Sequence, residues 1–424
     1  MKSIILVPDG APDEPVLELG GKTPLEAAAT PHLDYLAARG VVGRIRTIPE
    51  GLASGSDVGN LSILGVDPRG LAPGRAAWEA AGRGVPMGPL DLVFRCNLVS
   101  LADPRGGYSG GSLDPGLSLE DHTAGEIAES EASLLMRELN ASIGGPRVEF
   151  LAGLGYRNLM VVREEKAEAL LSAVMAPHQI LGQPIGRWLP REPRLLAWMR
   201  QAARILADHP INVARRSRGL RPANGIWLWG AGRRQNLPSF ESLFGKTGAL
   251  IAAVDLVRGL GTAMKMELIR VPGATGGLAS NLRGKAEAAL RALEGKDAVY
   301  VHVEAPDEAS HQRCVKAKIA AIERFDRDLV GPLLAGLHGL EWRILVVSDH
   351  VTKVTTGEHG TEPVPFLWAE ESGSPSGPGT RFSEVDARMS GILLEPGTRL
   401  IGLFLEGSEG RSIESFRVRA GVCR

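Results

Sequence analysis

Three aspartates each follow an apolar segment of the sequence. Each segment is rich in Val or Ile, as is typical of a parallel strand buried on both faces. Because ligands bind at the carboxyl ends of strands in open α/β sheets, we expect the three acids to meet at one edge. Carboxylates gathered there would repel one another unless cations lay between them. The segments and their acids are 4–7 with Asp9, 299–303 with Asp307, and 344–347 with Asp349.

Histidines accompany two of these acids. His311 follows Asp307 by four residues, so both side chains face the same way on a helical turn. His350 is adjacent to Asp349, and His359 follows nine residues later. Carboxylates combined with imidazoles suit Mn, Zn or Fe, and Mg where oxygen donors dominate. The pattern therefore predicts a metal site, and we expect it to hold two metal ions.

A metal site that does chemistry needs a group that reacts with substrate, and Ser56 is the candidate. It follows Gly55 and precedes the apolar segment 61–64, which predicts a helix beginning near Ser56. A hydroxyl at a helix N-terminus lies beside free backbone N–H groups, where phosphate binds. A bound divalent ion would lower its pKa and make it a nucleophile for phosphoryl transfer. The alternative is that Ser56 only caps the helix.

The order of elements predicts an α/β fold with two domains. Strands with following helices account for the two ends of the chain, whereas none of the acid-bearing strand ends lies between residues 94 and 223. We interpret that block as an inserted α/β domain, in which Thr123 and Glu126 form a capping box that opens a helix. The predicted catalytic domain then comprises residues 1–93 and 224–424.

The composition excludes several classes of protein. The 424 residues carry a net charge of -1, which gives no sign of nucleic-acid binding. No segment approaches the roughly 18 uncharged apolar residues of a membrane span. Three widely spaced cysteines favour a reducing environment and a cytoplasmic location. Oligomeric state is not indicated by the sequence.

Several motifs together resemble those of the archaeal-type 2,3-bisphosphoglycerate-independent phosphoglycerate mutases, which belong to the alkaline phosphatase superfamily. The likeness extends from the first strand to about Phe366. Its segments are 8–10 (PDG), 55–65 (GSDVGNLSILG), 94–97 (FRCN), 224–232 (NGIWLWGAG), 248–261, 300–311 (YVHVEAPDEASH), 348–350 (SDH) and His359 with the EPVPF that follows.

The resemblance implies an isomerase that interconverts 3-phosphoglycerate and 2-phosphoglycerate through a phosphoserine. It implies a mostly parallel sheet flanked by helices, with the inserted domain handling substrate, and closure of the site against water. Two divalent ions are implied, Mn first, with Mg, Zn or Co as alternatives. The implied residues are Ser56 as phosphate acceptor, Asp9, Asp349 and His350 with Ser56 at one metal, and Asp307, His311 and His359 at the other.

Substrate contacts are less constrained by the sequence. Candidates that could hold phosphate or carboxylate, or transfer protons, are Arg95, Asn97, His122, Arg157, His178, Arg258 and Lys285. The sequence departs from the family pattern at Gln179, Lys353 and Gly357, none of which is an expected metal ligand. A related phosphotransferase or phosphomonoesterase, including a homoserine-kinase-like enzyme, is therefore an alternative, and a metal-binding scaffold without turnover is another. A structural metal site needs no nucleophile, so Ser56 argues against the scaffold.

Overall fold

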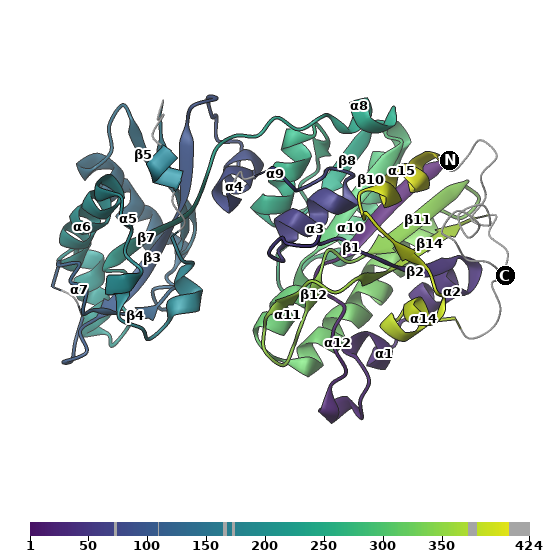
Figure 1. The fold of residues 1–424 in the computed structure, drawn as a ribbon, viewed down its shortest axis with the longest axis horizontal. Helices are drawn as coiled ribbons and strands as arrows, with labels where there is room; N and C mark the ends of the chain where they lie inside the picture. Colours follow the sequence, from purple (N-terminus) through teal and green to yellow (C-terminus); the bar gives the residue numbers. More distant parts are fainter. Residues whose placement is uncertain (72–73, 109, 164–167, 172–173, 372–379, 407–424) are drawn as a thin grey trace. The chain divides into compact units, whose positions relative to one another are not determined.

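The chain folds into two compact units, seen in a computed structural model (Figure 1). Unit 1 comprises Met1–Leu71 and Asn236–Arg424, and unit 2 comprises Ala72–Gln235. The structure describes residues 1–71, 74–108, 110–163, 168–171, 174–371 and 380–406.

Unit 1 is built on an eight-stranded sheet with the order β15-β2-β14-β11-β1-β10-β8-β9. Only β14 runs antiparallel to its neighbours, so the sheet is mostly parallel, as predicted. The strands are β1 Lys2–Pro8, β2 Val41–Ile45, β8 Gly248–Ile251, β9 Glu267–Leu268, β10 Ala298–Val303, β11 Trp342–Val347, β14 Val364–Glu370 and β15 Leu393–Leu394. A separate two-stranded ribbon joins β12 Val351–Thr352 to β13 His359–Gly360.

The strand β1 lies at the centre of this sheet, between β10 and β11. Val7 pairs with His302 of β10, and Leu6 pairs with Val346 of β11. All three strands run parallel, so their carboxyl ends lie next to one another. This register brings together the segments that follow them.

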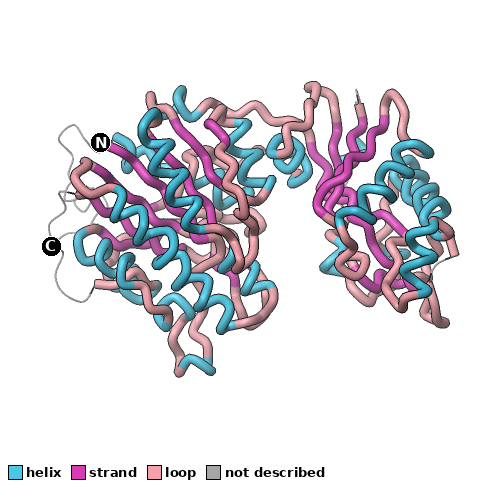
Figure 2. Tube along the Cα trace, turned by 180° about the vertical axis from the view of Figure 1, so that it is seen from behind, coloured by secondary structure: helices cyan, strands magenta, loops and turns pink. Residues whose placement is uncertain are grey.

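Helices cover both faces of the sheet, as the two opposite views show (Figures 1 and 2). One face packs Ile4 and Leu6 against α2, α10 and the helical segment 315–336. On the other face Trp368 of β14 contacts Phe404 of α15, with ring centroids 5.7 Å apart. The α/β fold class is therefore confirmed. The α-helices of unit 1 are α1 Pro24–Ala27, α2 Pro31–Arg39, α3 Ser56–Ile63, α8 Phe240–Phe244, α9 Asp255–Ala263, α10 Leu282–Gly295, α11 Ala305–His311, α12 Val315–Arg324, α13 Gly331–Gly336, α14 Glu384–Met389 and α15 Arg399–Glu406.

Unit 2 contains an antiparallel sheet in which β3 pairs with β4, β6 and β7, and β6 pairs with β5. Helices α5 and α6 pack on one face of this sheet, and α4 packs on the other. The elements are α4 Arg75–Gly82, β3 Leu92–Ala102, β4 Ser118–Asp121, α5 Glu129–Ser142, β5 Val148–Leu154, β6 Arg157–Val162, α6 Pro193–Ala207, α7 Pro210–Ser217 and β7 Gly225–Gly232, with short 3-10 turns Glu168–Leu171, Pro177–Ile180 and Ile185–Arg187.

The edges of unit 2 differ from the predicted domain edges at residues 94 and 223. Strand β7 pairs with β3 from Val93 to Val99, so it belongs to the sheet of unit 2. Pairing between distant strands leaves no local trace in the sequence, so the sequence did not indicate that β7 belongs to this unit. The predicted boundaries of the inserted domain, residues 94 and 223, stay a prediction.

The predicted start of the helix near Thr123 was wrong. Asp121 accepts hydrogen bonds from the backbone N–H groups of Thr123 and Gly125, and Ala124 and Glu126 adopt positive φ. These side-chain bonds replace the first helical turn, and the helix begins only at Glu129.

Within the described part of the chain, none of the helices combines the length and apolar character needed to cross a membrane.

Candidate metal centre and nucleophile

The three predicted aspartates lie together at the carboxyl edge of the sheet in unit 1. Asp9 follows β1 and Asp349 follows β11, whereas Asp307 lies in the first turn of α11, just after β10. All three are buried. Their proximity follows from the central position of β1.

Asp307, His311 and His359 form the first cluster. His311 Nε2 lies 3.2 Å from Asp307 Oδ2, and His359 Nε2 lies 3.4 Å from Asp307 Oδ1. The two imidazole Nε2 atoms are 3.0 Å apart. Helix α11 supplies the first two residues at spacing i, i+4, and the short strand β13 supplies the third.

Asp9, Asp349 and His350 form the second cluster, and Ser56 lies beside it. His350 Nε2 is 3.5 Å from Asp9 Oδ1 and 3.5 Å from Asp349 Oδ2. Ser56 Oγ is 3.2 Å from the same nitrogen. The serine and the three possible ligands are all buried.

The two clusters are adjacent within unit 1. The rings of His350 and His359 stack with centroids 4.0 Å apart. Thr352 also links them, because its hydroxyl donates to Asp307 Oδ1 at 2.6 Å and lies 3.1 Å from His350 Nδ1. A hydroxyl has one proton, so Nδ1–H of His350 must be the donor to Thr352. In the neutral ring, which burial favours, Nε2 then carries the lone pair on the side of Ser56, Asp9 and Asp349.

The hydrogen bonding of the buried Asp9 carboxylate indicates whether these residues suit cations. Among the described residues, neither Asp9 carboxylate oxygen has a hydrogen-bond donor. A buried carboxylate without donors is costly unless a cation binds it. The contacts of 3.0 to 3.5 Å within both clusters are also close to the separations of about 2.8–3.4 Å between neighbouring ligands bound at about 2.0–2.1 Å. The donor set therefore fits divalent cations.

The pKa shifts of the acids and of His350 also suit cation binding. Burial, followed by the charges of Asp349 and Glu304, raises the pKa of Asp9 well above its ordinary value. Burial also acts to raise the pKa of Asp307, but hydrogen bonds with His311 and His359 outweigh it and hold that pKa well below the usual range. Burial lowers the pKa of His350, which favours its neutral form. Neutral imidazole is the form that binds metals.

Helix α3 positions Ser56 by packing closely against the segment after β11. Gly59 lies directly against the backbone of Asp349, where a Cβ atom would collide with the carbonyl group. One turn from Ser56, Asn60 donates both to Ser56 O and to Asp349 Oδ2, each at 2.8 Å. Tyr300 of β10 donates to Asn60 Oδ1 at 2.5 Å. These contacts fix the distance between the hydroxyl and the second cluster.

Five of the seven candidate substrate residues lie in one cluster of unit 2. The His122 ring lies 6.1 Å from that of His178, which in turn lies 5.9 Å from Trp229. Arg95 stacks over Trp229 at 4.3 Å, and Asn97 accepts a hydrogen bond from the Trp229 indole. Arg157 stacks over Tyr156, whose ring contacts His122.

Arg95 is already engaged within this cluster. Its guanidinium pairs with Glu79 at 2.9 Å as well as stacking on Trp229. Burial lowers the pKa of Arg95 despite the opposing charge of Glu79. Its role as a substrate contact stays a prediction.

The other two candidates, Arg258 and Lys285, lie in unit 1. Arg258 is on α9, which packs against α3, and it pairs with Asp255 at 2.9 Å. Lys285 is buried on α10 and donates to the carbonyl oxygen of His302 at 2.6 Å. Burial lowers the pKa of Lys285 to about 8. Their roles toward substrate also stay predictions.

The three departures from the family pattern have local structural settings. Gln179 is exposed on the 3-10 turn Pro177–Ile180. Lys353 pairs with Glu14 at 3.3 Å. Gly357 adopts φ +75°, a conformation that glycine takes without strain.

This chain is similar to known proteins over nearly its whole length. The family model for 2,3-bisphosphoglycerate-independent phosphoglycerate mutase matches residues 37–212. A protein of Geobacter sulfurreducens, named a probable 2,3-bisphosphoglycerate-independent phosphoglycerate mutase, is 44% identical over 410 residues, covering 96% of this chain and 100% of the relative. A protein of Methanothrix thermoacetophila named as that mutase is 42% identical over 412 residues, with coverage of 96% and 100%. The chain belongs to the 2,3-bisphosphoglycerate-independent phosphoglycerate mutase family.

Two solved structures resemble the fold of this family member. A protein from Pyrococcus horikoshii aligns with TM-score 0.78 and 28% identity, covering 97% of this chain and 99% of the other. The cofactor-independent phosphoglycerate mutase from Thermoplasma acidophilum aligns with TM-score 0.61 and 25% identity, covering 96% and 100%.

Several residues that contact the clusters were not singled out from the sequence of this mutase-family chain. Tyr300 and His302 alternate along β10, and Glu304 follows at the same spacing. Period-two polar residues within an apolar strand point to one face of a sheet. That alternation is the signal that could have identified them. Asn60 and Thr352 carry no comparable signal.

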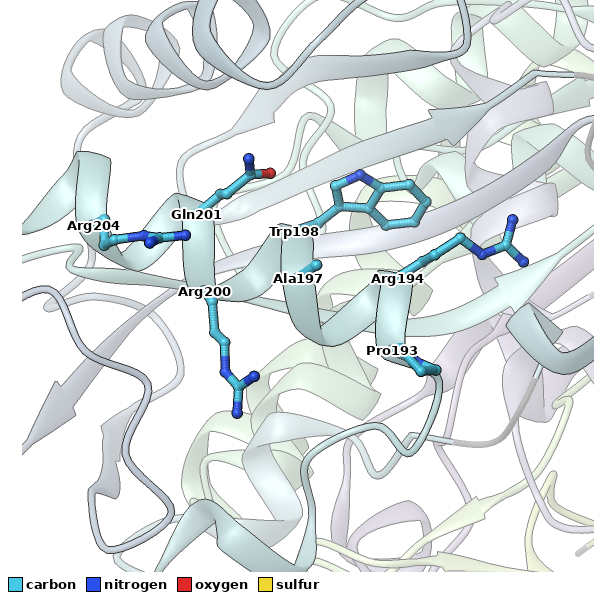
Figure 3. A pocket seen from close by; sticks show the side chains of 7 residues that line it. All are labelled: Pro193, Arg194, Ala197, Trp198, Arg200, Gln201 and Arg204. Atoms are coloured by element: carbon cyan, nitrogen blue, oxygen red, sulfur yellow. The ribbon is translucent and has the colours of Figure 1, made fainter.

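A surface hollow of about 420 Å³ lies elsewhere, along α6 in unit 2 (Figure 3). Its arginine side chains extend in different directions and do not converge on one anion. We therefore assign it no part in the chemistry of the family. Its lining residues are Pro193, Arg194, Ala197, Trp198, Arg200, Gln201 and Arg204.

Proposed function

We propose that this protein is an isomerase that interconverts 3-phosphoglycerate and 2-phosphoglycerate without 2,3-bisphosphoglycerate. Ser56 accepts the phosphoryl group and returns it to the other hydroxyl of glycerate. The proposal combines the family relationship with one observation, the position of Ser56 Oγ 3.2 Å from His350 Nε2 beside two adjacent clusters of metal-ligand residues.

The first turn of α3 suits the phosphoryl group. The N–H of Gly59 is bonded to Gly55 O, so the N–H groups of Ser56, Asp57 and Val58 precede the first helical bond. Such N–H groups and the positive end of the helix dipole favour phosphate oxygens. Ser56 Oγ therefore lies where an incoming phosphorus atom would be held.

The reaction requires two transfers at the same serine. In the first, Ser56 Oγ loses its proton and bonds to phosphorus, the bond between phosphorus and the C3 oxygen of glycerate breaks, and that oxygen takes a proton. In the second, the C2 hydroxyl loses its proton and attacks phosphoserine, the Oγ–P bond breaks, and Ser56 Oγ takes a proton as 2-phosphoglycerate forms. Divalent cations supply charge stabilisation and lower the pKa of the serine hydroxyl.

The cation ligands belong to the same proposal. Asp9, Asp349 and His350 with Ser56 hold one ion, whereas Asp307, His311 and His359 hold the other. Three histidines among these ligands favour Mn over Mg. The lone pair of His350 Nε2, aligned by Thr352, supports this assignment.

The substrate contacts are proposed for Arg95, Asn97, His122, Arg157 and His178 in unit 2. Their clustering supports a shared role, and two imidazoles at 6.1 Å offer proton transfer. Arg258 and Lys285 complete the proposed set in unit 1. A cytoplasmic location is part of the proposal, supported by the unpaired Cys96 and Cys314.

The test is an enolase-coupled assay of 3-phosphoglycerate conversion with Mn²⁺ and without 2,3-bisphosphoglycerate. We expect activity in the native protein and its loss in Ser56→Ala, with Mn²⁺ still bound because the acids and imidazoles remain. Ser62→Ala is the matched control, since this buried hydroxyl on the same helix has no partner among described residues. Substrate labelled in its phosphoryl group should label the peptide that contains Ser56.

Residual activity of Ser56→Ala above about one per cent would count against Ser56 as the nucleophile, because loss of a nucleophile typically costs far more. Phosphate release without isomerisation, or ATP-dependent phosphorylation of homoserine, would instead identify the related phosphotransferase.

A further inference from the structure

The two carboxylate oxygens of Asp9 face different groups. Oδ1 lies 3.5 Å from His350 Nε2, within the second cluster. Oδ2 lies 3.0 Å from His302 Nε2, on β10. A carboxylate whose two oxygens lie beside separate nitrogens has the arrangement of a bridging ligand.

His302 and Glu304 form a third cluster with Asp9. One possible ligand atom from each of the three residues lies within 4.8 Å of the others. His302 is 1% exposed and Asp9 is fully buried. The Nδ1 atom of His302 is 3.8 Å from Glu304 Oε2, so Glu304 lies alongside the ring.

The contact between His302 and Asp9 is not a hydrogen bond. Across the residues that the structure describes, neither His302 Nε2 nor Asp9 Oδ2 has a hydrogen-bond partner, although they are 3.0 Å apart. The geometry at Nε2 therefore does not meet that of a hydrogen bond to the carboxylate. Two polar atoms at this separation that do not point at each other are arranged as neighbouring ligands of one cation are, at about 3 Å.

We propose that Asp9, His302 and Glu304 bind a third divalent cation, Mg²⁺ or Mn²⁺, and that Asp9 bridges it to the second cluster. Two carboxylates and one imidazole form a donor set suited to these hard cations. The inference rests on the proposed function, because Asp9 serves both sites.

The amino group of Lys285 does not substitute for this cation. Lys285 directs its Nζ to the carbonyl oxygen of His302, 2.6 Å away. The carbonyl group belongs to the backbone of β10, so this bond does not involve the ring nitrogens of His302. The Lys285 charge interacts with that of Glu304 and offsets part of the local negative charge.

The test measures how many cations the full-length protein binds and where they lie. Protein stripped with chelator and dialysed against excess Mn²⁺ is analysed by plasma mass spectrometry, and its crystals by anomalous scattering from Mn. We expect three Mn²⁺ per chain, with one anomalous peak among Asp9, His302 and Glu304. The variant His302→Gln with Glu304→Gln should retain two.

The matched control changes the same residue types at exposed positions of unit 1. His338→Gln with Glu341→Gln should retain three Mn²⁺, because both side chains are exposed. Two Mn²⁺ in the native protein, at the first and second clusters alone, would overturn the third site and leave the proposed function standing. Absence of Mn²⁺ from all three clusters would defeat both.

Three Mn²⁺ in the His302 and Glu304 variant would also overturn the proposal, because the third ion would then lie elsewhere. If that variant does not fold, the anomalous map of the native protein decides alone.

Discussion

Replacing Asn60 with alanine should weaken cation binding more than a loss of stability alone predicts. Asn60→Ala removes the bond to the Asp349 carboxylate, worth about 1.5–3 kcal/mol for a charged acceptor, and leaves the buried Tyr300 hydroxyl unpaired at a cost of about 1–3 kcal/mol. We expect the free energy of unfolding to fall by about 3–5 kcal/mol. Because Asp349 loses the donor that orients it, Mn²⁺ affinity should fall about 10–100-fold.

Tyr300→Phe separates orientation of the ligand from general destabilisation. It leaves the Asn60 amide bonded to Asp349 and removes one hydroxyl, so we expect a loss of about 1–2 kcal/mol and nearly native Mn²⁺ affinity. Urea unfolding of metal-free protein measures stability, and isothermal titration with Mn²⁺ measures affinity. The reasoning is refuted if Asn60→Ala binds Mn²⁺ as tightly as the native protein. It is refuted equally if both variants lose the same fraction of affinity.

Three other perturbations have outcomes that the structure determines. A Gly→Ala change ordinarily stabilises a helix by about 1 kcal/mol. Gly59→Ala should instead lower the free energy of unfolding by about 1–3 kcal/mol and kcat roughly 100-fold, because its Cβ meets the Asp349 backbone. A thermal melt measures the first effect and the coupled assay the second, and a gain in melting temperature would contradict the packing. Burial raises the pKa of Glu384 to about 7, so its folded form keeps a proton that the unfolded chain loses near pH 4.5. Its stabilising contribution is therefore full below about pH 4.5 and is lost as pH rises through 7. The loss in the free energy of unfolding is on the order of 2 kcal/mol, because the side chain is partly exposed. In urea unfolding from pH 4.5 to 8, Glu384→Gln should lack this decrease in the free energy of unfolding with pH, and an unchanged decrease would exclude Glu384 as its source. Chelation with EDTA should inactivate the enzyme reversibly, with Mn²⁺ restoring more activity than Mg²⁺; full turnover by metal-free protein would be incompatible with the proposal.

The parts of the site that follow strands were predictable from the sequence. Parallel strands end at a common edge, so apolar segments ending near Asp9, Asp307 and Asp349 were enough to expect the acids to meet. The spacing of Asp307 and His311 gave their common direction on α11. The Gly55-Ser56 junction likewise predicted the start of α3, although Gly55 occupies the cap position and Ser56 is the first helical residue.

The remaining parts depend on contacts between distant segments. Asn60 gains its role only because α3 packs on the segment after β11, and sequence spacing does not report that packing. His302 looked like part of an apolar strand until its register beside Val7 placed it next to Asp9. The pairing of β3 with β7, which sets the edge of unit 2, is similarly non-local.

The central position of β1 makes the cation site and the fold of unit 1 depend on each other. The N–H of Gly10 donates to Asp349 Oδ1 although 339 residues separate them, and Asp9 lies beside His302 and His350 from two other segments. Without cations, burial and neighbouring acids oppose ionisation of Asp9, so the gathered acids lower the free energy of unfolding. A cation that binds only the folded protein offsets this loss. It raises the free energy of unfolding by an amount that grows with the ratio of the cation concentration to the Kd of the site. Since β1 lies before the unit 2 segment and β10 and β11 lie after it, cation binding favours the state in which the two separated parts of unit 1 have joined.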